Sequence, residues 1–253
     1  MNPPASQWEG FPTWLVAIGA VSIAMMVMGY VYGIPLLARA VADRVPSSAV
    51  ERLSASTLAA LDRDVLQPTV VPLGRRRELD AAFARLAKAG GSTNAYRLVF
   101  RKSEAIGANA MALPSGTIVI TDGLMALAKD DRELLGVLAH EAGHVDERHG
   151  LRGLLQRSLA GLLVAWFAGD LSSIAAAAPA ALLDASYSRA LEREADDYAV
   201  RLLRANGIPL QHFANILRRL DQASGAAGTP AALAYLSSHP ATSERLARLD
   251  DRR

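Results

Sequence analysis

The chain has 253 residues, no cysteine and a formal net charge of +2. This length is sufficient for one domain with its own core, and the lack of cysteine excludes disulfides and thiolate metal sites. The basic residues are not interleaved with aromatic residues, so the composition does not indicate a nucleic-acid partner.

The first predicted element is an uncharged apolar segment from Phe11 to Ala38. A helix needs about 20 apolar residues to cross the hydrocarbon of a bilayer, and this segment is longer. A cleaved signal peptide fits less well, because it has a core of about 7 to 15 apolar residues preceded by positive charge. We therefore predict a single-pass transmembrane anchor with its juxtamembrane segment over residues 1–45, followed by one globular domain over residues 46–253.

The domain is predicted to be α+β and mainly helical, with a small β-sheet. Residues 47–90 are expected to form two helices around a break that contains proline and glycine. Strands are expected over Tyr96–Arg101, Ala108–Ala112 and Thr117–Thr121, and the turn Pro114–Gly116 joins the last two.

The next predicted helix begins after Asp130 and carries His140-Glu141-Ala142-Gly143-His144. Residues four apart share one helix face, so the rings of His140 and His144 can bind one metal ion. Glu141 would lie beside the metal and take a proton from a zinc-bound water, whose pKa falls to about 7. The motif also arises by chance on solvated helix faces. Here apolar residues predict a half-buried helix, in which an unpartnered histidine pair would be costly, so the pattern favours zinc-dependent peptide hydrolysis.

A catalytic zinc ion takes three protein ligands, so a third must be found. His149 is set aside, because it is predicted to project from the opposite side of the helix. Glu192 and Asp196 share one face of a later helix, and Glu194 is predicted to point away from it. We expect Glu192 to bind the metal and Asp196 to accept the ring N–H of a ligand histidine. Taken alone, such a charged helix is more often a solvated face.

These residues, together with Asn109–Thr117, His239-Pro240 and Arg245, resemble the membrane-associated zinc metallopeptidase family of HtpX and the CAAX prenyl proteases (metallopeptidase family forty-eight). The similarity is nearest to the single-anchor subgroup of the mitochondrial stress protease. It implies a zincin-like domain of the gluzincin type over residues 46–253, which binds one Zn²⁺ per chain. The residue roles that it implies are His140, His144 and Glu192 as metal ligands, Glu141 as general base and acid, and Asp196 as support for a ligand.

A second apolar stretch, residues 158–183, lies between the two halves of the predicted site. A single membrane crossing would place His144 and Glu192 on opposite sides, so it is excluded. Asp170 and Pro179 divide the stretch into pieces that are too short to span a bilayer. We predict a hairpin that packs on the domain and contacts lipid, and an ordinary buried helical pair is the alternative.

Two further sets of residues are candidates for contact with the substrate. In zinc proteases of this shape an edge strand aligns the substrate by main-chain hydrogen bonds, and the resemblance assigns this role to Asn109, Ala110, Met111 and Ala112. An ordinary hairpin is the alternative. His239, on a loop before a proline, and Arg245 are predicted to donate hydrogen bonds to the anionic intermediate, with a structural cap as the alternative.

The predicted function is hydrolysis of misfolded or membrane-proximal polypeptides by a zinc endopeptidase anchored in the lipid bilayer. A zinc-containing chaperone or scaffold of protein quality control is the second hypothesis, although binding alone does not require Glu141 beside the metal. A peptidase for prenylated substrates would need a hydrophobic chamber, and a single transmembrane helix supplies too little surface to enclose one. The resemblance favours a bacterial inner membrane with the domain in the periplasm, whereas Arg39, Arg44 and Arg52 after the anchor favour the cytoplasm.

Overall fold

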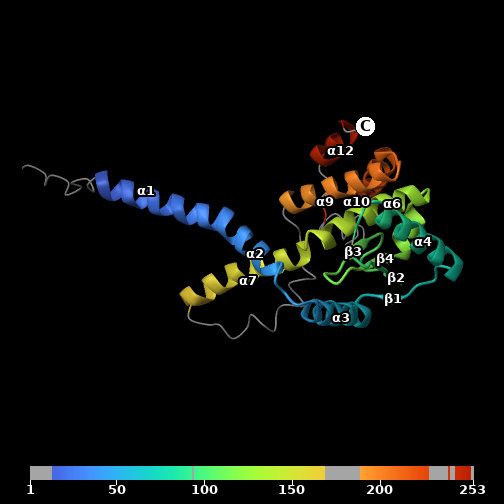
Figure 1. Cartoon of the computed structure of the whole chain (residues 1–253), viewed down its shortest axis with the longest axis horizontal. Helices are drawn as coiled ribbons and strands as arrows, with labels where there is room; N and C mark the ends of the chain where they lie inside the picture. Colours follow the sequence, from blue (N-terminus) through green and yellow to red (C-terminus); the bar gives the residue numbers. More distant parts are fainter. Residues whose placement is uncertain (1–12, 93, 169–188, 228–238, 240–242, 252–253) are drawn as a thin grey trace, which may run out of the picture.

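The computed structural model describes residues 13–92, 94–168, 189–227, 239 and 243–251. Figure 1 shows a helical domain with a small sheet, from which a long N-terminal helix projects. The described elements, in chain order, are α1 (Thr13–Met28), the π-helix η1 (Gly29–Gly33), α2 (Ile34–Ala42), α3 (Ser47–Asp64), β1 (Gln67–Pro68), α4 (Leu73–Ala89), β2 (Arg97–Lys102), β3 (Ala110–Ala112), β4 (Thr117–Thr121), α5 (Asp122–Leu127), α6 (Asp131–Asp146), α7 (His149–Ala168), α9 (Arg189–Ala205), α10 (Leu210–Ala227) and α12 (Ser243–Asp251).

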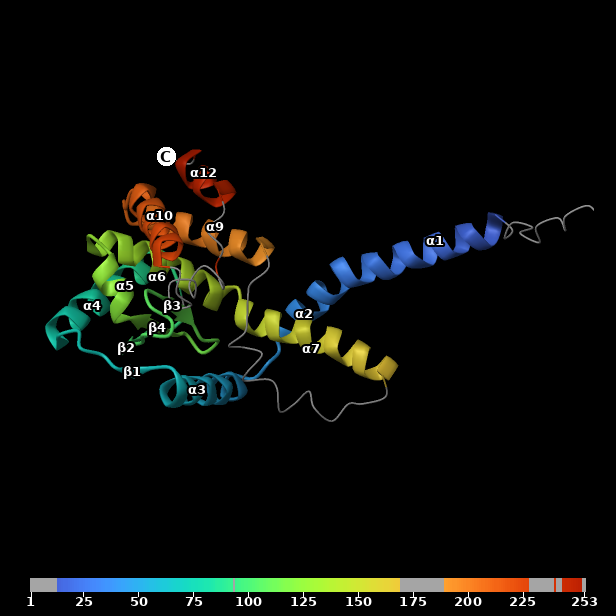
Figure 2. The ribbon, with the colours of Figure 1, turned by 180° about the vertical axis from the view of Figure 1, so that it is seen from behind.

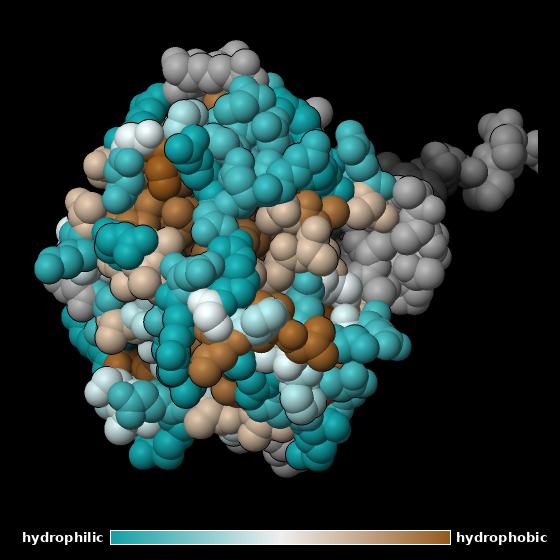
Figure 3. Space-filling view, turned by 90° about the vertical axis from the view of Figure 1, so that its right-hand side faces the viewer, coloured by the Kyte–Doolittle hydropathy of each residue, from teal (hydrophilic) through white to brown (hydrophobic). Residues whose placement is uncertain are grey.

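The projecting helix combines α1, η1 and α2. It is continuous over the 29 residues from Trp14 to Ala42 and is long and apolar enough to cross a membrane. Its large apolar side chains are exposed, for example Met25 at 70% and Met26 at 72%. In contrast, the end of the domain away from α1 presents mostly hydrophilic side chains with small apolar patches among them (Figure 3). An apolar surface of this extent calls for an apolar environment, which suggests a membrane anchor.

The sheet is mixed and has the strand order β1-β2-β4-β3. β2 pairs in parallel with β4, whereas β3 and β4 form an antiparallel hairpin in which Ala110 lies opposite Ile120. The three predicted strands are therefore confirmed, although β3 begins two residues later than expected. Gly116 in the hairpin turn has φ +89°, and a Cβ there would lie 2.4 Å from the carbonyl oxygen of Ala95, so this turn requires glycine.

Helix α6 lies at the centre of the domain, between the sheet and the helices α9 and α10 (Figures 1 and 2). Its first turn is fixed by Asp130, whose side chain accepts a hydrogen bond from the backbone N–H of Glu133 at 3.1 Å. Every residue from Glu133 to Val145 is buried. The prediction of a half-buried helix was therefore wrong in degree, because neighbouring elements cover α6 on all faces.

Helix α7 follows α6 and runs beside α2 at the base of the projecting helix (Figures 1 and 2). Arg148, just before α7, donates a hydrogen bond to the carbonyl of Ala42 at 2.9 Å, which ties the start of α7 to the end of α2. Residues 158–168 of the predicted hairpin belong to this single helix. The rest of that hairpin, with Asp170 and Pro179, lies outside the described residues.

Candidate metal centre

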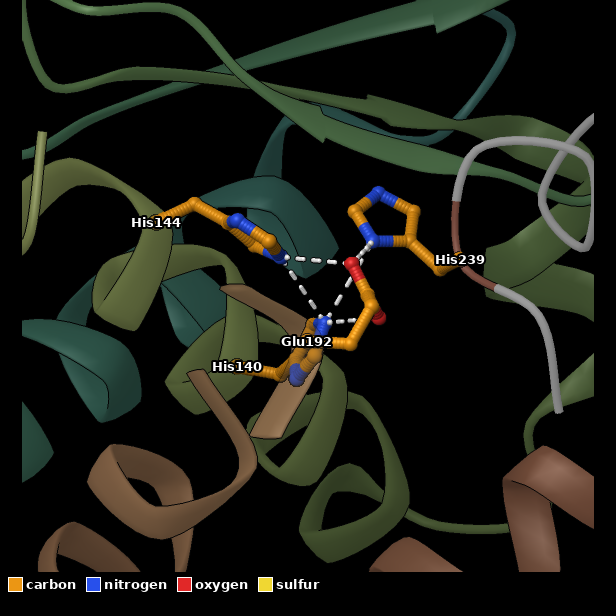
Figure 4. Close-up of side chains that lie close together, drawn as sticks. All are labelled: His140, His144, Glu192 and His239. Atoms are coloured by element: carbon orange, nitrogen blue, oxygen red, sulfur yellow. Dashed lines mark hydrogen bonds and ion pairs between the residues drawn. The ribbon is translucent and has the colours of Figure 1, made fainter. Parts of the chain in front are cut away.

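Four buried side chains converge between α6, α9 and the loop before α12 (Figure 4). They are His140 and His144 from α6, Glu192 from α9, and His239, and one potential ligand atom of each lies within 4.8 Å of the others. The two histidine Nε2 atoms of α6 are 3.0 Å apart, and each lies 3.4 Å from a carboxylate oxygen of Glu192. The structure thus brings together the three residues that the sequence predicted as ligands.

The donor set fits a divalent metal ion. Two imidazole nitrogens and a carboxylate form a common zinc site. Nδ1 of His140 faces a carboxylate oxygen of Asp196 at 3.0 Å, so this nitrogen carries the proton and Nε2 offers its lone pair to the centre. Nearby, Oε1 of Glu141 is buried and accepts no hydrogen bond from the described part of the chain. Without a cation, the lone pairs of the histidine Nε2 atoms and of the Glu192 carboxylate would face one another in a buried place. A bound cation would offset this unfavourable arrangement.

The electrostatics of the two α6 histidines also indicate room for one positive charge. Burial and Arg245 lower the pKa of His140, but hydrogen bonds to Asp196 and Glu192 outweigh them and raise it to about 9. Burial lowers the pKa of His144 well below its ordinary value. The two rings are therefore not both positively charged, and a metal ion between their Nε2 atoms would take the place of the one additional proton that His140 would otherwise hold.

A glycine within the histidine motif permits this convergence. A Cβ on Gly143 would lie only 3.0 Å from the Cα and the carbonyl oxygen of Ala195 and from the Cβ of Tyr198. Helices α6 and α9 therefore approach more closely than a side chain at this position would allow. Because Glu192 lies one turn before Ala195, this close approach brings its carboxylate to the histidines.

Glu141 lies beside the convergent group, and the edge strand β3 fixes its orientation. Its Oε2 accepts a hydrogen bond from the backbone N–H of Ala112 at 2.9 Å, and its Oε1 lies 3.6 Å from Nε2 of His239. Burial raises the pKa of Glu141 above its ordinary value. A carboxylate with a raised pKa next to a metal site is suited to accept a proton and release it again.

Asp196 and Arg245 form a buried ion pair behind His140. The Nε and Nη2 atoms of Arg245 donate to the two oxygens of Asp196 at 2.7 and 2.8 Å, and its Nη1 lies 3.1 Å from Glu192. Burial would raise the pKa of Asp196, but Arg245 and His140 lower it below its ordinary value. Asp196 thus faces the ring N–H that the sequence assigned to it, whereas Arg245 is occupied by two carboxylates.

The sequence reasoning missed a group of residues behind His144. Helix α6 ends at Asp146 and Arg148 has φ +53°, so the chain turns and brings His149 back to the site. Nδ1 of His149 lies 2.9 Å from Nδ1 of His144, and its Nε2 lies 3.2 Å from Glu194. His149 is absent from the convergent group, as expected, but the geometric reason given for this was wrong. Glu194, predicted to point away from the face that carries Glu192 and Asp196, is not among the four convergent residues and lies against His149.

The charges in this second group are fixed by burial and by an arginine. Burial lowers the pKa of His149 to about 4, so the ring is neutral near pH 7. Arg152 donates to Glu194 at 2.6 and 3.2 Å. Although burial raises the pKa of Glu194, the hydrogen bonds from Arg152 and His149 lower it to about 2, and its carboxylate is charged. The sequence signal for this group was the third histidine within ten residues.

The candidate substrate strand is the edge strand β3 together with the residue before it. Asn109 and Ala110 are buried, and Met111 and Ala112 are half-buried. The backbone N–H of Thr121 donates to the carbonyl of Asn109 at 2.9 Å, and the N–H of Asn109 donates to the side-chain hydroxyl of Thr121 at 2.8 Å. Because pairing alternates along an antiparallel strand, the N–H and C=O of Ala112 point to the side of β3 away from β4.

The fold and this site define a metallopeptidase. Paired histidines one turn apart on a buried helix, a carboxylate from a second helix close to both rings and a further carboxylate next to the first histidine are typical of that class. Residues 73–253 match the family model described as Peptidase family M48, and the chain belongs to this family.

Curated relatives of known class share part of the chain. Metalloprotease YcaL of Escherichia coli is 29% identical over 181 residues, which cover 67% of this chain and 68% of YcaL. Mitochondrial metalloendopeptidase OMA1 of Schizosaccharomyces pombe is 27% identical over 56% of this chain and 43% of its own length. The beta-barrel assembly-enhancing protease of E. coli is 30% identical over 55% of this chain and 31% of its own length. The match therefore spans less than half of the last two proteins.

Proposed function

We propose that this protein is a membrane-anchored, zinc-dependent endopeptidase that cleaves misfolded or membrane-proximal polypeptides. The observation that carries the proposal is the position of Glu141, a buried carboxylate directed at a His/His/Glu group. A zinc ion held by His140, His144 and Glu192 would act as a Lewis acid that lowers the pKa of a water and polarises the peptide carbonyl. The relatives are named as metalloproteases and a metalloendopeptidase, which supports cleavage of peptide bonds.

Glu141 is the proton carrier in this mechanism. The N–H of Ala112 holds one of its carboxylate oxygens, so the other is directed towards the centre. Its raised pKa lets it take a proton from the attacking water and deliver the proton to the departing amine nitrogen. A binding function alone would not require a buried carboxylate in this place, because its burial has a cost in free energy.

The Glu141→Gln variant tests the proposal. Glutamine keeps the size of the side chain but cannot accept the proton, so cleavage of labelled, unfolded casein should fall by at least about 100-fold. Zinc content, measured on the same samples, should stay at the wild-type level. Equal cleavage by both proteins at equal zinc content would reject the protease mechanism and leave the chaperone or scaffold hypothesis.

We propose that His239 donates a hydrogen bond to the anionic intermediate and that Arg245 acts through Asp196 and Glu192. The ring of His239 lies between Glu192, 2.9 Å from its Nδ1, and Glu141, 3.6 Å from its Nε2. His239→Ala should slow cleavage by about 100- to 1000-fold and leave zinc bound. Loss of zinc from this variant would instead identify His239 as a ligand, and unchanged turnover would leave it a structural cap.

We propose that the substrate backbone adds to the edge of the sheet at β3, within the candidate set Asn109–Ala112. Of these four residues, Ala112 is the best placed, because it is half-buried, lies next to Glu141 and directs its C=O away from β4. Main-chain pairing beside the general base would present a peptide bond irrespective of the substrate sequence. Prolines at Ala110 and Ala112 should leave zinc bound and slow cleavage, and undiminished turnover would reject this assignment.

We propose that the helix from Trp14 to Ala42 crosses a bacterial inner membrane once and that the domain faces the periplasm. Its length, apolar composition and exposed side chains support the crossing. The periplasmic side follows the family resemblance, whereas the arginines that follow the helix favour the opposite orientation. Extraction with alkaline carbonate should leave the protein in the membrane pellet. A reporter fused after Arg253 should be active only in the periplasm, and cytoplasmic activity would reverse the assignment.

A further inference from the structure

The proposed mechanism makes no use of a connected set of polar side chains behind His144. The ring of His149 is fully buried, and it lies between Nδ1 of His144 at 2.9 Å and the carboxylate of Glu194 at 3.2 Å. Arg152 neutralises this carboxylate at 2.6 Å. A buried histidine with a polar group at each ring nitrogen is specifically oriented, and its tautomer follows from its neighbours.

The direction of each hydrogen bond can be assigned in order from Glu194. An ionised carboxylate only accepts, so Nε2 of His149 carries the proton and donates to Glu194. Two ring N–H groups cannot face each other at 2.9 Å, so Nδ1 of His149, whose proton is on Nε2, accepts a hydrogen bond from Nδ1–H of His144. With its proton on Nδ1, His144 presents the lone pair of Nε2 to His140 and Glu192, 3.0 and 3.4 Å away.

We propose that His149 is a positioning residue that fixes the tautomer and ring orientation of His144, and that Glu194 with Arg152 fixes His149. The inference rests on the proposed metal site, because only a ligand needs the Nε2 lone pair at that place. Asp196 makes the corresponding contact to His140 directly, at 3.0 Å. Groups of this kind typically contribute about 10- to 100-fold to metal affinity, because they hold the ligand in its binding orientation.

A purely structural role is the alternative, since His149 begins α7 and Glu194 belongs to α9, so their contact also joins two helices. Such a role would change stability and leave the affinity for metal intact once the protein is folded. Zinc affinity and the ring tautomer of His144 are therefore the measurements that separate the two roles.

The test uses the full chain in detergent micelles, with zinc affinity measured by competition with a chromophoric chelator. His149→Phe keeps an aromatic ring but removes the acceptor, so affinity should fall by about 10- to 100-fold. His149→Gln keeps an acceptor and a donor and should restore most of the loss. His212→Phe is the matched control, because His212 lies on α10 and pairs with Asp130 at 3.2 Å, and its affinity should equal that of the wild type.

A folded His149→Phe variant with wild-type zinc affinity would overturn the inference. Should that variant fail to fold, nitrogen NMR of the metal-free wild type still tests the inference. The inference requires the ring proton of His144 on Nδ1. A ring proton on Nε2 would overturn it. If the wild type itself bound no zinc, the proposed function would fail instead. The two failures are therefore distinguishable.

Discussion

His140 and His144 lie one turn apart on the same helix, yet the groups behind their two rings differ. Behind His140 a carboxylate, Asp196, faces the ring directly, and its side chain is only 6% exposed. Behind His144 a second ring, His149, separates the ligand from Glu194, whose side chain is 36% exposed. His140 is thus supported by a direct contact inside the core. His144 is supported through the ring of His149, at the start of α7, by a carboxylate nearer to solvent.

The two histidines have the same requirement, a hydrogen-bond partner at Nδ1, and the fold meets it in two different ways. Each ligand ring needs a partner at Nδ1, so that Nε2 is free to bind. Helix α9 supplies both carboxylates, from positions two residues apart: Asp196 contacts His140 on α6, whereas Glu194 contacts His149 on α7. Because a charge interacts more strongly in a dry interior than near solvent, substitutions on the His140 side should have the larger effect.

The largest effect is expected for Asp196→Asn. Zinc affinity should fall by about 10- to 100-fold, because the amide no longer selects the Nδ1–H tautomer of His140. The free energy of unfolding of the metal-free protein should also fall, by about 3 kcal/mol, because Arg245 keeps only part of its buried compensation. Chelator competition and thermal unfolding measure the two quantities.

Asp197→Asn is the control for this variant. Asp197 is the next residue on α9, and its side chain is partly exposed and pairs with Arg248 at 3.0 Å. Surface pairs of this type contribute between about 0 and 1 kcal/mol, so the control should behave like the wild type. Equal zinc affinities of Asp196→Asn and Asp197→Asn would show that the His140 side needs no carboxylate.

An intermediate effect is expected for Gly143→Ala. This substitution should push apart α6 and α9, the helices that carry the two ligand histidines and the carboxylates behind them. The new methyl group would press on the backbone of Ala195, and such overpacking typically costs about 1 to 3 kcal/mol in the free energy of unfolding. Zinc affinity should fall as well, because Glu192 moves with α9. Gly74→Ala on α4, where no atom lies within 4 Å, is the control and should keep both quantities. A Gly143→Ala protein with unchanged affinity would show that the helix spacing does not set the site.

The helical periodicity of the sequence was sufficient to predict the two histidines and the base on one helix. Residues four apart on a helix share a face in any context, so His140 and His144 are near each other whatever surrounds them. The distance between α6 and α9 is a tertiary property, and Glu192 was assigned with the help of family resemblance. The burial of α6 on every face was underestimated, because covering elements leave no local pattern.

The connection behind His144 could not be predicted, because it depends on a break of two residues, Glu147 and Arg148, between α6 and α7. A continuous helix would have directed His149 to the far side, and the positive φ of Arg148 redirects it. Arginine has no strong preference for this conformation, so the sequence gives little sign of the break. The contact of Glu194 depends on where His149 lies, so the sequence offered no partner for Glu194 once His149 was placed on the far side of the helix.

The smallest effect is expected for Glu194→Gln. The glutamine carbonyl can still accept the hydrogen bond from His149, and the position is partly exposed, so zinc affinity should fall by less than about 10-fold. Because the pKa of Glu194 is about 2, its carboxylate is charged throughout the neutral range, and the ratio of the two affinities should not change with pH there. Glu244→Gln, which removes an exposed carboxylate 3.6 Å from Arg193, is the control. If Glu194→Gln lost as much zinc affinity as Asp196→Asn, the ring of His149 between Glu194 and His144 would not weaken the support of His144. The two ligand histidines would then be supported equally.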